Sequence, residues 1–274
     1  MPARQLSLNL FIDPGGHHEA AWRYRASQPE RLLDITFYQD LARRAEAAKL
    51  DAIFFADGPA LADNIRYASR FRLEPLTWLS AIAAATTRIG LIGTASTTYT
   101  EPYNLARQFA SLVHLSGGRA GWNIVTTAAA AAAQNFGLSS HPVHADRYDR
   151  AREYLDVITK LWDSWEDDAL VVDPVSGIFA DTGKIHAIDH IGRHFKVAGP
   201  LNLPRPPQGR PVYVQAGASN DGRSFAAPYA EAIFTAHQTR RGLFREDYAG
   251  TTLRDHFGLP RPASVFTRKL RESA

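Results

Sequence analysis

The sequence predicts an α/β protein built on a parallel sheet, and three observations lead to this class. Short apolar runs typical of strands alternate with longer segments in which apolar residues recur at helical spacing. The strand-like runs are almost continuously apolar, which indicates that both faces of the sheet are buried. The length of 274 residues suits a single α/β barrel. These observations agree with a barrel and with a doubly wound sheet alike.

The expected order is strand and helix repeated four times, an insertion, and then strand, helix and strand. The predicted strands span residues 6–12, 51–57, 88–97, 120–127, 211–217 and 230–236. The predicted helices span residues 35–50, 74–87, 104–115 and 148–165, with a short helix between the last two strands. The insertion, at about 167–210, is rich in Asp, Gly, His and Pro. Six strands are two fewer than a closed barrel of this type contains.

The composition excludes several classes of function. Lysine plus arginine number 31 against 28 aspartate plus glutamate, a surplus too small for a nucleic-acid surface. No segment approaches the roughly 18 continuous apolar residues of a membrane helix. The absence of cysteine rules out disulfides and a cysteine nucleophile, and is compatible with a reducing cytoplasm. We therefore expect a cytoplasmic protein that binds a small molecule, and neither nucleic acid nor a membrane.

The segment HLSGGRAGWNIVTT, residues 114–127, contains three glycines and raises the question of a phosphate-binding loop. Such loops run from a strand through the glycines into a helix, because a helix N-terminus offers free N–H groups. Here the order is reversed, since a helix ends near Leu115 and a strand follows. Gly117 or Gly118 is therefore predicted to end the helix in the left-handed conformation.

Polar residues stand at the ends of four predicted strands. They are Asp57, Thr94 to Thr98, Asn123 to Thr127, and Ser219 of QAGAS. The carboxyl ends of parallel strands share one edge of a sheet, so these residues predict a site for a polar ligand there. Ser219 also has the order that a phosphate site requires, with a strand before it and a helix starting near Arg223 after it. The alternative for each residue is a capping or turn role.

Histidines gather in two places. In HPVHADRY, either Asp146 caps the following helix while the histidines lie in solvent, or His144 and Tyr148 lie over a cofactor. His186, His190 and His194 recur every four residues, but flanking glycines favour an irregular or hairpin segment over a helix that binds metal. No standard zinc spacing is present, so no metal site is predicted, and no G-x-S-x-G elbow supports a serine triad.

Several motifs together carry a resemblance to a known family. They include FFADG, GTASTTYTEPYNLARQFASLVHLSGGRAGWNIVTT, HADRYDRAREYLDVITKLWDSWEDDA, HFKVAGPLNLPRPPQGRPVYVQAGAS and AEAIFTAHQT. The chain resembles the flavin-dependent monooxygenases of the bacterial-luciferase-like superfamily, in the branch of nitrilotriacetate monooxygenase component A, dibenzothiophene-sulfone monooxygenase and long-chain alkane monooxygenase. The resemblance covers residues 6–239 almost without a break.

The resemblance implies a TIM-like (β/α) barrel that uses reduced FMN and O₂, with a separate NAD(P)H:flavin reductase supplying the reduced FMN to a two-component monooxygenase. By motif, the implied flavin-site positions are Asp57, Thr94, Asn123, His144, Tyr148 and Ser219, of which Ser219 would hold the phosphate. The cofactor carries the chemistry, and the protein orients it and excludes water. No catalytic side chain is assigned.

The chain departs from the family pattern twice. Six alanines, Ala128 to Ala133, stand where the family normally has polar residues. We expect the alanine run to start a helix. The family is also longer, and residues 240–274 resemble its extreme C-terminus joined directly to a barrel domain of residues 1–239. An internal deletion would then remove the last two strands and leave about six of eight. An open barrel exposes two sheet edges, so a homo-oligomer or an inactive flavin-binding remnant is also considered.

Overall fold

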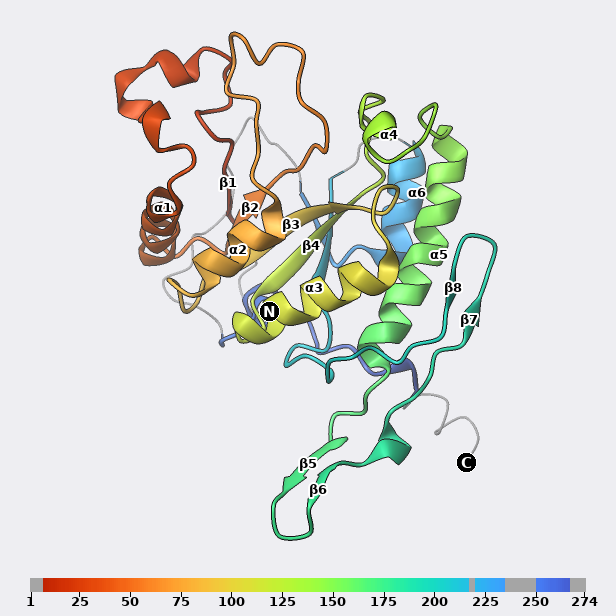
Figure 1. The fold of residues 1–274 in the computed structure, drawn as a ribbon. Coiled ribbons are helices and arrows are strands. Elements are labelled where there is room, and N and C mark those ends of the chain that lie inside the picture. Colours follow the sequence, from red (N-terminus) through yellow and green to blue (C-terminus); the bar gives the residue numbers. More distant parts are fainter. Residues whose placement is uncertain (1–6, 217–219, 235–249, 267–274) are drawn as a thin grey trace, which may run out of the picture.

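The computed structural model describes residues 7–216, 220–234 and 250–266, and its centre is a six-stranded parallel sheet (Figure 1). The strand order is β1-β2-β3-β4-β9-β10, so the sheet follows the chain without rearrangement. Its strands are β1 (Asn9–Phe11), β2 (Ala52–Phe55), β3 (Gly90–Ser96), β4 (Ala120–Val125), β9 (Val212–Gln215) and β10 (Ala232–Ile233). The prediction of an α/β, TIM-like barrel with six strands is confirmed.

Helices connect the strands as expected. They are α1 (Ile35–Ala47), α2 (Pro75–Ala83), α3 (Pro102–Leu115), α4 (Ala132–Asn135), α5 (His144–Asp163), α6 (Asn220–Tyr229) and α7 (Leu253–Phe257). Short 3₁₀ turns lie at Ala21–Arg23, Arg25–Ser27, Pro29–Arg31 and Thr182–Lys184. The alanine run leads into α4, as predicted, and helix α3 begins two residues early because Pro102 suits the first helical position.

The start of α5 and the β5–β6 hairpin differ from the prediction, whereas the β7–β8 hairpin is one of the two forms expected for its segment. The long helix α5 begins at His144, four residues before the predicted start, because the chain turns helical directly after the extended Val143. The insertion is not wholly irregular but holds two antiparallel hairpins. These are β5 (Leu170–Asp173) with β6 (Ile178–Ala180), and β7 (His190–Ile191) with β8 (Lys196–Val197). The β5–β6 hairpin extends away from the sheet (Figure 1).

The end of α3 confirms the prediction made for the glycine-rich segment. Gly117 and Gly118 have φ values of 64° and 93°, in the left-handed region. Gly118 N–H donates to the Val113 carbonyl over 2.8 Å, and Gly117 N–H to the His114 carbonyl over 3.1 Å. This pair of bonds is the Schellman motif, which ends a helix and satisfies its last carbonyls. The glycines therefore end a helix, as predicted.

Aromatic residues fill the outer face of the sheet, against α3 and α5. Trp122 of β4 is fully buried, and its ring contacts Phe109 of α3 and Trp162 of α5. Its indole N–H donates to the Ala95 carbonyl, while that of Trp162 donates to the Ala106 carbonyl. Both tryptophans thus bury a large apolar surface without leaving an N–H unpaired, which is the condition for placing tryptophan in a core.

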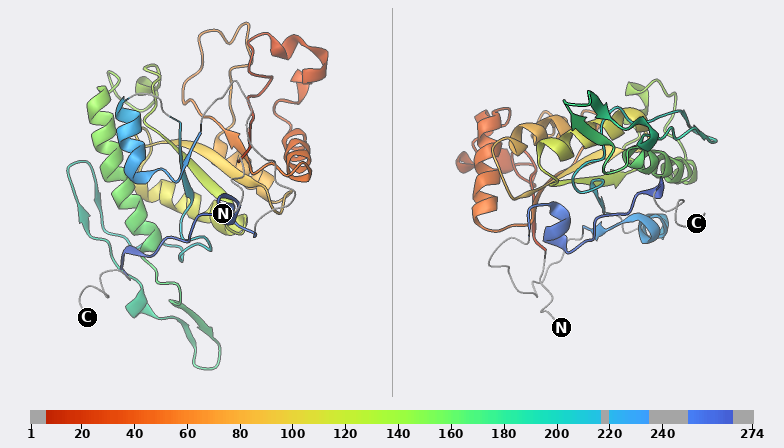
Figure 2. Two further views of the ribbon diagram at one scale, coloured as in Figure 1. Left: turned by 180° about the vertical axis from the view of Figure 1, so that it is seen from behind. Right: turned by 90° about the horizontal axis from the view of Figure 1, so that it is seen from below.

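The inner face carries a separate apolar cluster that includes a residue from the C-terminal segment. Phe54, Ile92, Val212 and Val214 alternate with the outward residues of their strands and pack around Leu253 of α7. Two strand glycines, Gly90 and Gly121, face Leu253 so closely that a Cβ atom on either would press against it. Figure 2 shows α7 on the side of the sheet opposite α2 and α3.

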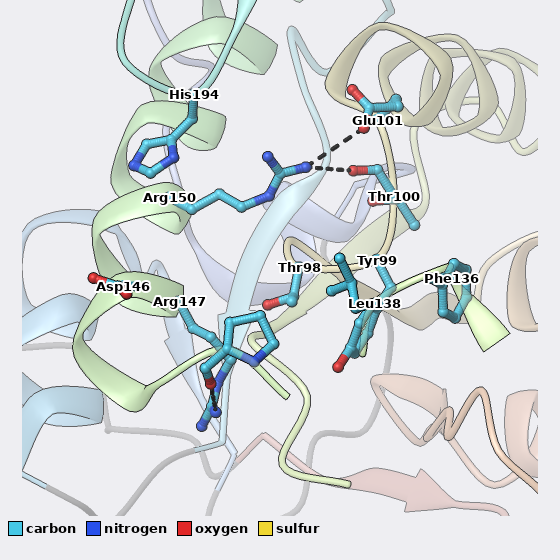
Figure 3. Close-up of a pocket in the computed structure, with 11 residues that line it drawn as sticks. Thr98, Tyr99, Thr100, Glu101, Phe136, Leu138, Asp146, Arg147, Arg150 and His194 are labelled. Atoms are coloured by element: carbon cyan, nitrogen blue, oxygen red, sulfur yellow. Dashed lines mark hydrogen bonds and ion pairs between the residues drawn. The ribbon is translucent and has the colours of Figure 1, made fainter. Parts of the chain in front are cut away.

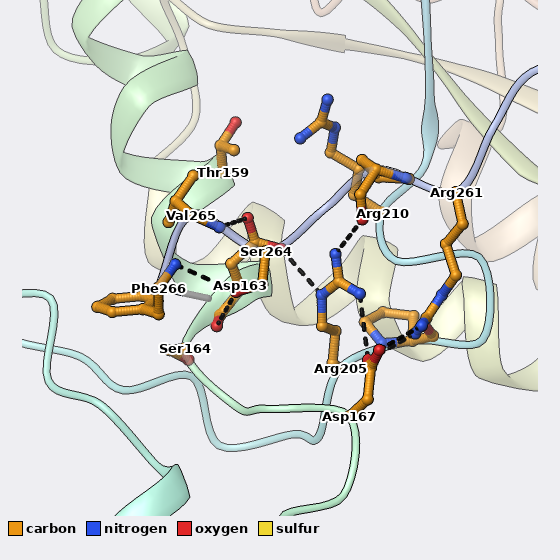
Figure 4. A network of polar contacts seen from close by, with 12 residues as sticks. Thr159, Asp163, Ser164, Asp167, Arg205, Arg210, Arg261, Ser264, Val265 and Phe266 are labelled. Carbon is orange, nitrogen blue, oxygen red and sulfur yellow. Dashed lines mark hydrogen bonds and ion pairs between the residues drawn. The ribbon is translucent and has the colours of Figure 1, made fainter. Parts of the chain in front are cut away.

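A network of ion pairs anchors the C-terminal segment further along (Figure 4). Arg205 donates to Asp163 over 3.0 Å and to Asp167 over 3.1 Å, and Asp167 also accepts from Arg261. The second oxygen of Asp163 accepts the backbone N–H of Val265 over 3.0 Å. Asp163 and Arg205 are almost wholly buried. These contacts join the end of α5 to residues 261–265.

Replacing Leu253 by alanine tests whether the C-terminal segment completes the core. Leu253 is 0% exposed, so Leu253→Ala should lower the free energy of unfolding by about 2–5 kcal/mol, measured by urea denaturation. The matched control is Leu115→Ala at the end of α3, where the side chain is 67% exposed and the change should stay within about 0.5 kcal/mol. Equal effects at the two positions would contradict the packing of α7.

Candidate functional site

The carboxyl edge of the sheet brings two predicted site residues together. Thr94 of β3 and Asn123 of β4 are register partners, and the Asn123 amide donates to the Thr94 hydroxyl over 2.9 Å. Both side chains are 3% exposed. The Asn123 Oδ1 atom has no hydrogen-bond partner among the described residues. A buried, unpaired amide oxygen is costly, and this one lies on β4 two residues before the strand ends at Val125, where a donor group of a ligand would satisfy it.

Hydroxyl groups tie together the two loops that follow β3 and β4. The Thr127 hydroxyl donates to the Ser96 hydroxyl over 2.7 Å, and the Thr98 hydroxyl donates to the Thr126 carbonyl over 2.9 Å. Thr127 has a φ of 52°, which is unusual for a β-branched residue and costs on the order of 1–3 kcal/mol. The polar strand ends predicted at residues 94–98 and 123–127 therefore do converge.

Asp57 follows β2 at the same edge of the sheet. Its carboxylate accepts the backbone N–H of Gly58 over 2.8 Å. Burial raises the pKa of Asp57, and the nearby Glu74 carboxylate raises it further, while the Gly58 bond and Arg72 lower it. A carboxyl group that is held partly out of water beside Glu74 is suited to hydrogen-bonding a ligand.

His144 and Tyr148 lie together on α5 and face α6. Their rings are 4.9 Å apart, His144 Nε2 lies 2.9 Å from Asp221 Oδ2, and the Tyr148 ring contacts Phe225. Residue Asn220 begins α6, so the sequence order expected for a phosphate site is present. Ser219, predicted to hold the phosphate, lies outside the described residues.

The residues that are described fit a flavin at the carboxyl edge. The Asn123 amide oxygen is buried without a partner, beside the Thr94 hydroxyl. His144 supplies an imidazole at the start of a 20-residue helix, whose N-terminus favours negative charge such as a phosphate. A flavin needs polar partners for its ring and for its phosphate, and both kinds are present.

Of the two alternatives for HPVHADRY, the capping role of Asp146 is not what the structure shows, while the His144 side chain is 48% exposed. Val143 is the N-cap residue and makes no side-chain bond, and Asp146 lies within the first helical turn. His141 Nδ1 lies 2.6 Å from the Tyr99 hydroxyl, and His144 contacts Asp221. Asp146 still stabilises the helix, because a negative charge in the first turn interacts favourably with the positive end of the helix dipole.

The three regularly spaced histidines form separate ion pairs. His186 lies 2.8 Å from Glu166, His190 lies 3.0 Å from Glu153, and His194 lies 2.9 Å from Asp149. Each histidine uses a different carboxylate, and no group of three residues able to hold a metal occurs in the described part of the chain. As predicted, this segment is a hairpin, and the histidines fasten it to α5 and to residue 166.

Sequence reasoning missed a cavity beside the predicted flavin positions. It has a volume of about 520 Å³ and lies between the loop before α3, the segment before α5, and the β7–β8 hairpin (Figure 3). Arg147 and Arg150 line it from α5, and Tyr99 and Phe136 line it from the two loops. The only sequence signal was the spacing of the arginines, three residues apart and hence on one helix face.

The incomplete β/α barrel, with polar groups gathered at its carboxyl edge, defines the class of protein. Residues 14–250 match the luciferase-like monooxygenase family. The chain belongs to this family. This confirms the resemblance found in the motifs.

Individual relatives agree with the family match. The chain is 50% identical to nitrilotriacetate monooxygenase component A of Aminobacter aminovorans over 86% of its own length and 55% of the relative's. It is 46% identical to N-acetyl-S-(2-succino)cysteine monooxygenase of Bacillus subtilis and 43% identical to dibenzothiophene-sulfone monooxygenase of Rhodococcus erythropolis. These matches cover 85% of the chain and 53% and 54% of the relatives. The chain thus spans about half the length of these relatives.

Solved structures show the same partial match. A long-chain alkane monooxygenase superposes with a TM-score of 0.80 at 38% identity, over 84% of this chain and 56% of the other. A riboflavin lyase, solved with modified FMN and riboflavin, superposes with the same TM-score and identity over 86% of this chain and 55% of the lyase. The fold is therefore shared with a protein whose structure contains a modified FMN. Among the described helices, none is long and apolar enough to cross a membrane.

Replacing Asp57 by asparagine tests the environment of its carboxyl group. Because the pKa of Asp57 is raised on folding, the folded protein binds this proton more tightly than the unfolded chain does. The contribution to stability is present below the unfolded pKa of about 3.9 and is lost as pH rises through the folded pKa. The difference in unfolding free energy, Asp57→Asn minus wild type, should therefore grow with pH above about 4. Urea denaturation across a pH series measures this difference, and a constant value would contradict the raised pKa.

Proposed function

We propose that this chain is the oxygenase component of a two-component flavin-dependent monooxygenase. It would use reduced FMN, supplied by a separate NAD(P)H:flavin reductase, and O₂ to oxidise a small organic molecule. The observation that carries the proposal is the buried Thr94–Asn123 pair with its unpaired amide oxygen, at the carboxyl edge of a luciferase-like fold. A cytoplasmic location belongs to the same proposal and agrees with the cysteine-free sequence.

The six predicted residues would divide the binding of the flavin. Ser219 would hold the phosphate, His144 and Tyr148 would bind the flavin from the start of α5, and Asp57, Thr94 and Asn123 would line the ring. Bound reduced flavin supplies the electrons for oxygen activation. The chain's own groups bind and orient the flavin, and the buried edge excludes water. No side chain is proposed as a nucleophile.

The substrate class stays broad in this proposal. The relatives are named for an aminopolycarboxylate, a succinylated cysteine and an aromatic sulfone, and the structural neighbour is named for long-chain alkanes. An organosulfur compound, an aminopolycarboxylate or a hydrocarbon-like molecule therefore agrees with the proposal.

A second candidate is a flavin-binding protein without monooxygenase activity. It is favoured by the open sheet, in which β1 and β10 each have one neighbouring strand among the described residues, and by the half-length match to the relatives. Part of the wall that closes the site would then be missing. A homo-oligomer that covers the open edges would restore part of it.

Titration with FMN tests the flavin site that both candidates share. Binding should quench the flavin fluorescence and perturb its absorbance, and both signals should saturate. An unchanged signal at high protein concentration would remove both candidates. If FMN binds, reduced FMN should be mixed with oxygenated buffer and its reoxidation followed by absorbance. A time course altered by the protein supports the monooxygenase, while one identical to free flavin supports the inactive flavin-binding protein.

Ser219→Ala tests the phosphate position separately. Loss of a hydrogen bond to a charged phosphate should cost about 1.5–3 kcal/mol, which weakens FMN binding roughly tenfold to 150-fold. Ser224→Ala is the matched control, because Ser224 is an exposed serine on α6. The dissociation constant of FMN, measured by fluorescence quenching, should stay at the wild-type value in the control. Equal affinities in both variants would refute the role of Ser219.

A further inference from the structure

We propose that the cavity beside the N-terminal part of α5 binds a small carboxylate with a flat apolar body. The cavity has a volume of about 520 Å³, within the range of small-molecule sites. Nothing in the proposed flavin function uses it. Two arginines of α5 supply its positive charge, and the loops after β3 and β4 supply an apolar wall (Figure 3).

Arg147 carries the argument because its charge is buried without a carboxylate partner. The residue is 9% exposed. Its guanidinium donates to the Pro142 carbonyl over 2.7 Å and lies 3.2 Å from His144 Nδ1, and neither contact is with a carboxylate. Its Nε atom has no hydrogen-bond partner, and no ion pair of Arg147 occurs among the described residues. A buried cation in this state is costly unless an anion joins it.

Arg150 adds a second, partly available guanidinium. Its side chain is 23% exposed, and its Nη2 atom makes two long contacts of 3.5 Å, to the Thr100 carbonyl and to Glu101. Its Nε atom donates to the Thr97 carbonyl, and its guanidinium lies over the Phe195 ring. These contacts hold the Arg150 guanidinium one helical turn from Arg147. Its contact with a carboxylate, that of Glu101, is long at 3.5 Å.

The carboxylates around the cavity do not cancel this charge. Glu101 is 75% exposed, Asp146 is also exposed, and water screens charges in such positions. Burial lowers the pKa of the nearby His141, and the Arg147 charge lowers it further. The third carboxylate nearby, Asp149, accepts from His194 and Arg193. The lining thus holds two guanidinium groups and two carboxylates, and Arg147 is the buried member of the four.

The opposite wall is apolar and flat. The Tyr99 and Phe136 rings stack with centroids 4.8 Å apart and an interplanar angle of 22°. Phe136 and Leu138 are both partly exposed, at 46% and 39%, so a ligand can reach them. A guanidinium pair on one side and stacked rings on the other match a carboxylate attached to an aromatic or similarly flat group.

The cavity is distinct from the predicted flavin positions. His144 and Tyr148 lie four residues apart and face α6, whereas Asp146, Arg147 and Arg150 line the cavity. Among the described residues, the two regions meet where Arg147 contacts His144. The proposal therefore does not rest on flavin binding, and its test uses the protein without added flavin.

Benzoate and benzamide form a matched pair of probes, equal in shape and different in charge. Isothermal titration calorimetry or ligand-observed NMR should show saturable binding of benzoate and binding of benzamide at least tenfold weaker. Inorganic phosphate tests the alternative of a simple oxyanion site and should bind more weakly than benzoate. Equal binding of benzoate and benzamide, no binding of benzoate, or preferred binding of phosphate would each overturn the proposal.

Substitutions in the cavity test whether benzoate binds there. Arg147→Met should weaken benzoate binding about tenfold to hundredfold by removing charge-assisted hydrogen bonds. Arg152→Met, at an exposed arginine on the same helix, should leave it unchanged. If Arg147→Met does not fold, as judged by circular dichroism, Phe136→Ala replaces it. This variant changes a half-exposed ring and should weaken benzoate several-fold while leaving phosphate unaffected. Wild-type benzoate affinity in a folded Arg147→Met or Phe136→Ala variant would refute the site.

Discussion

The packing of Leu253 against two strand glycines is the contact on which the inner face of the sheet depends. A parallel sheet with apolar residues on both faces needs cover on both sides. Helices α2, α3 and α5 cover the outer face, while Leu253 enters the inner face where Gly90 and Gly121 leave room. Phe54 contacts Phe11 and Phe234 there, so the rings of strand β2 and of both edge strands meet. The segment of residues 250–266 thus contributes Leu253 to the core.

The same sheet sets the geometry of the carboxyl edge. Parallel pairing of β3 with β4 brings Thr94 beside Asn123, and it brings the two following loops close enough for their hydroxyl groups to bond. The cavity is a further consequence, because those loops and the first turns of α5 form its walls. Core packing and the polar edge are therefore two results of one strand register. A shift of one residue would turn Thr94 and Asn123 to the opposite face.

The order of the elements was predictable because strand and helix leave different apolar patterns. The continuous apolar runs gave the six strands, and the left-handed glycines after α3 followed from their place between a helix and a strand. The start of α5 was missed because no capping side chain marks Val143. The β5–β6 hairpin was missed because short strands with exposed residues lack a clear period. Motif resemblance supplied the family, which periodicity alone could not.

By itself, the sequence determined the α/β class, the number of strands, the family and the polar residues at the strand ends, because these depend on local pattern and motif. Tertiary structure decided which side chains lack partners. The unpaired Asn123 oxygen, the unpaired charge of Arg147 and the glycines that receive Leu253 all depend on segments far apart in the chain. Burial and pairing are properties of the folded surroundings, and the spacing of residues along the chain does not encode them.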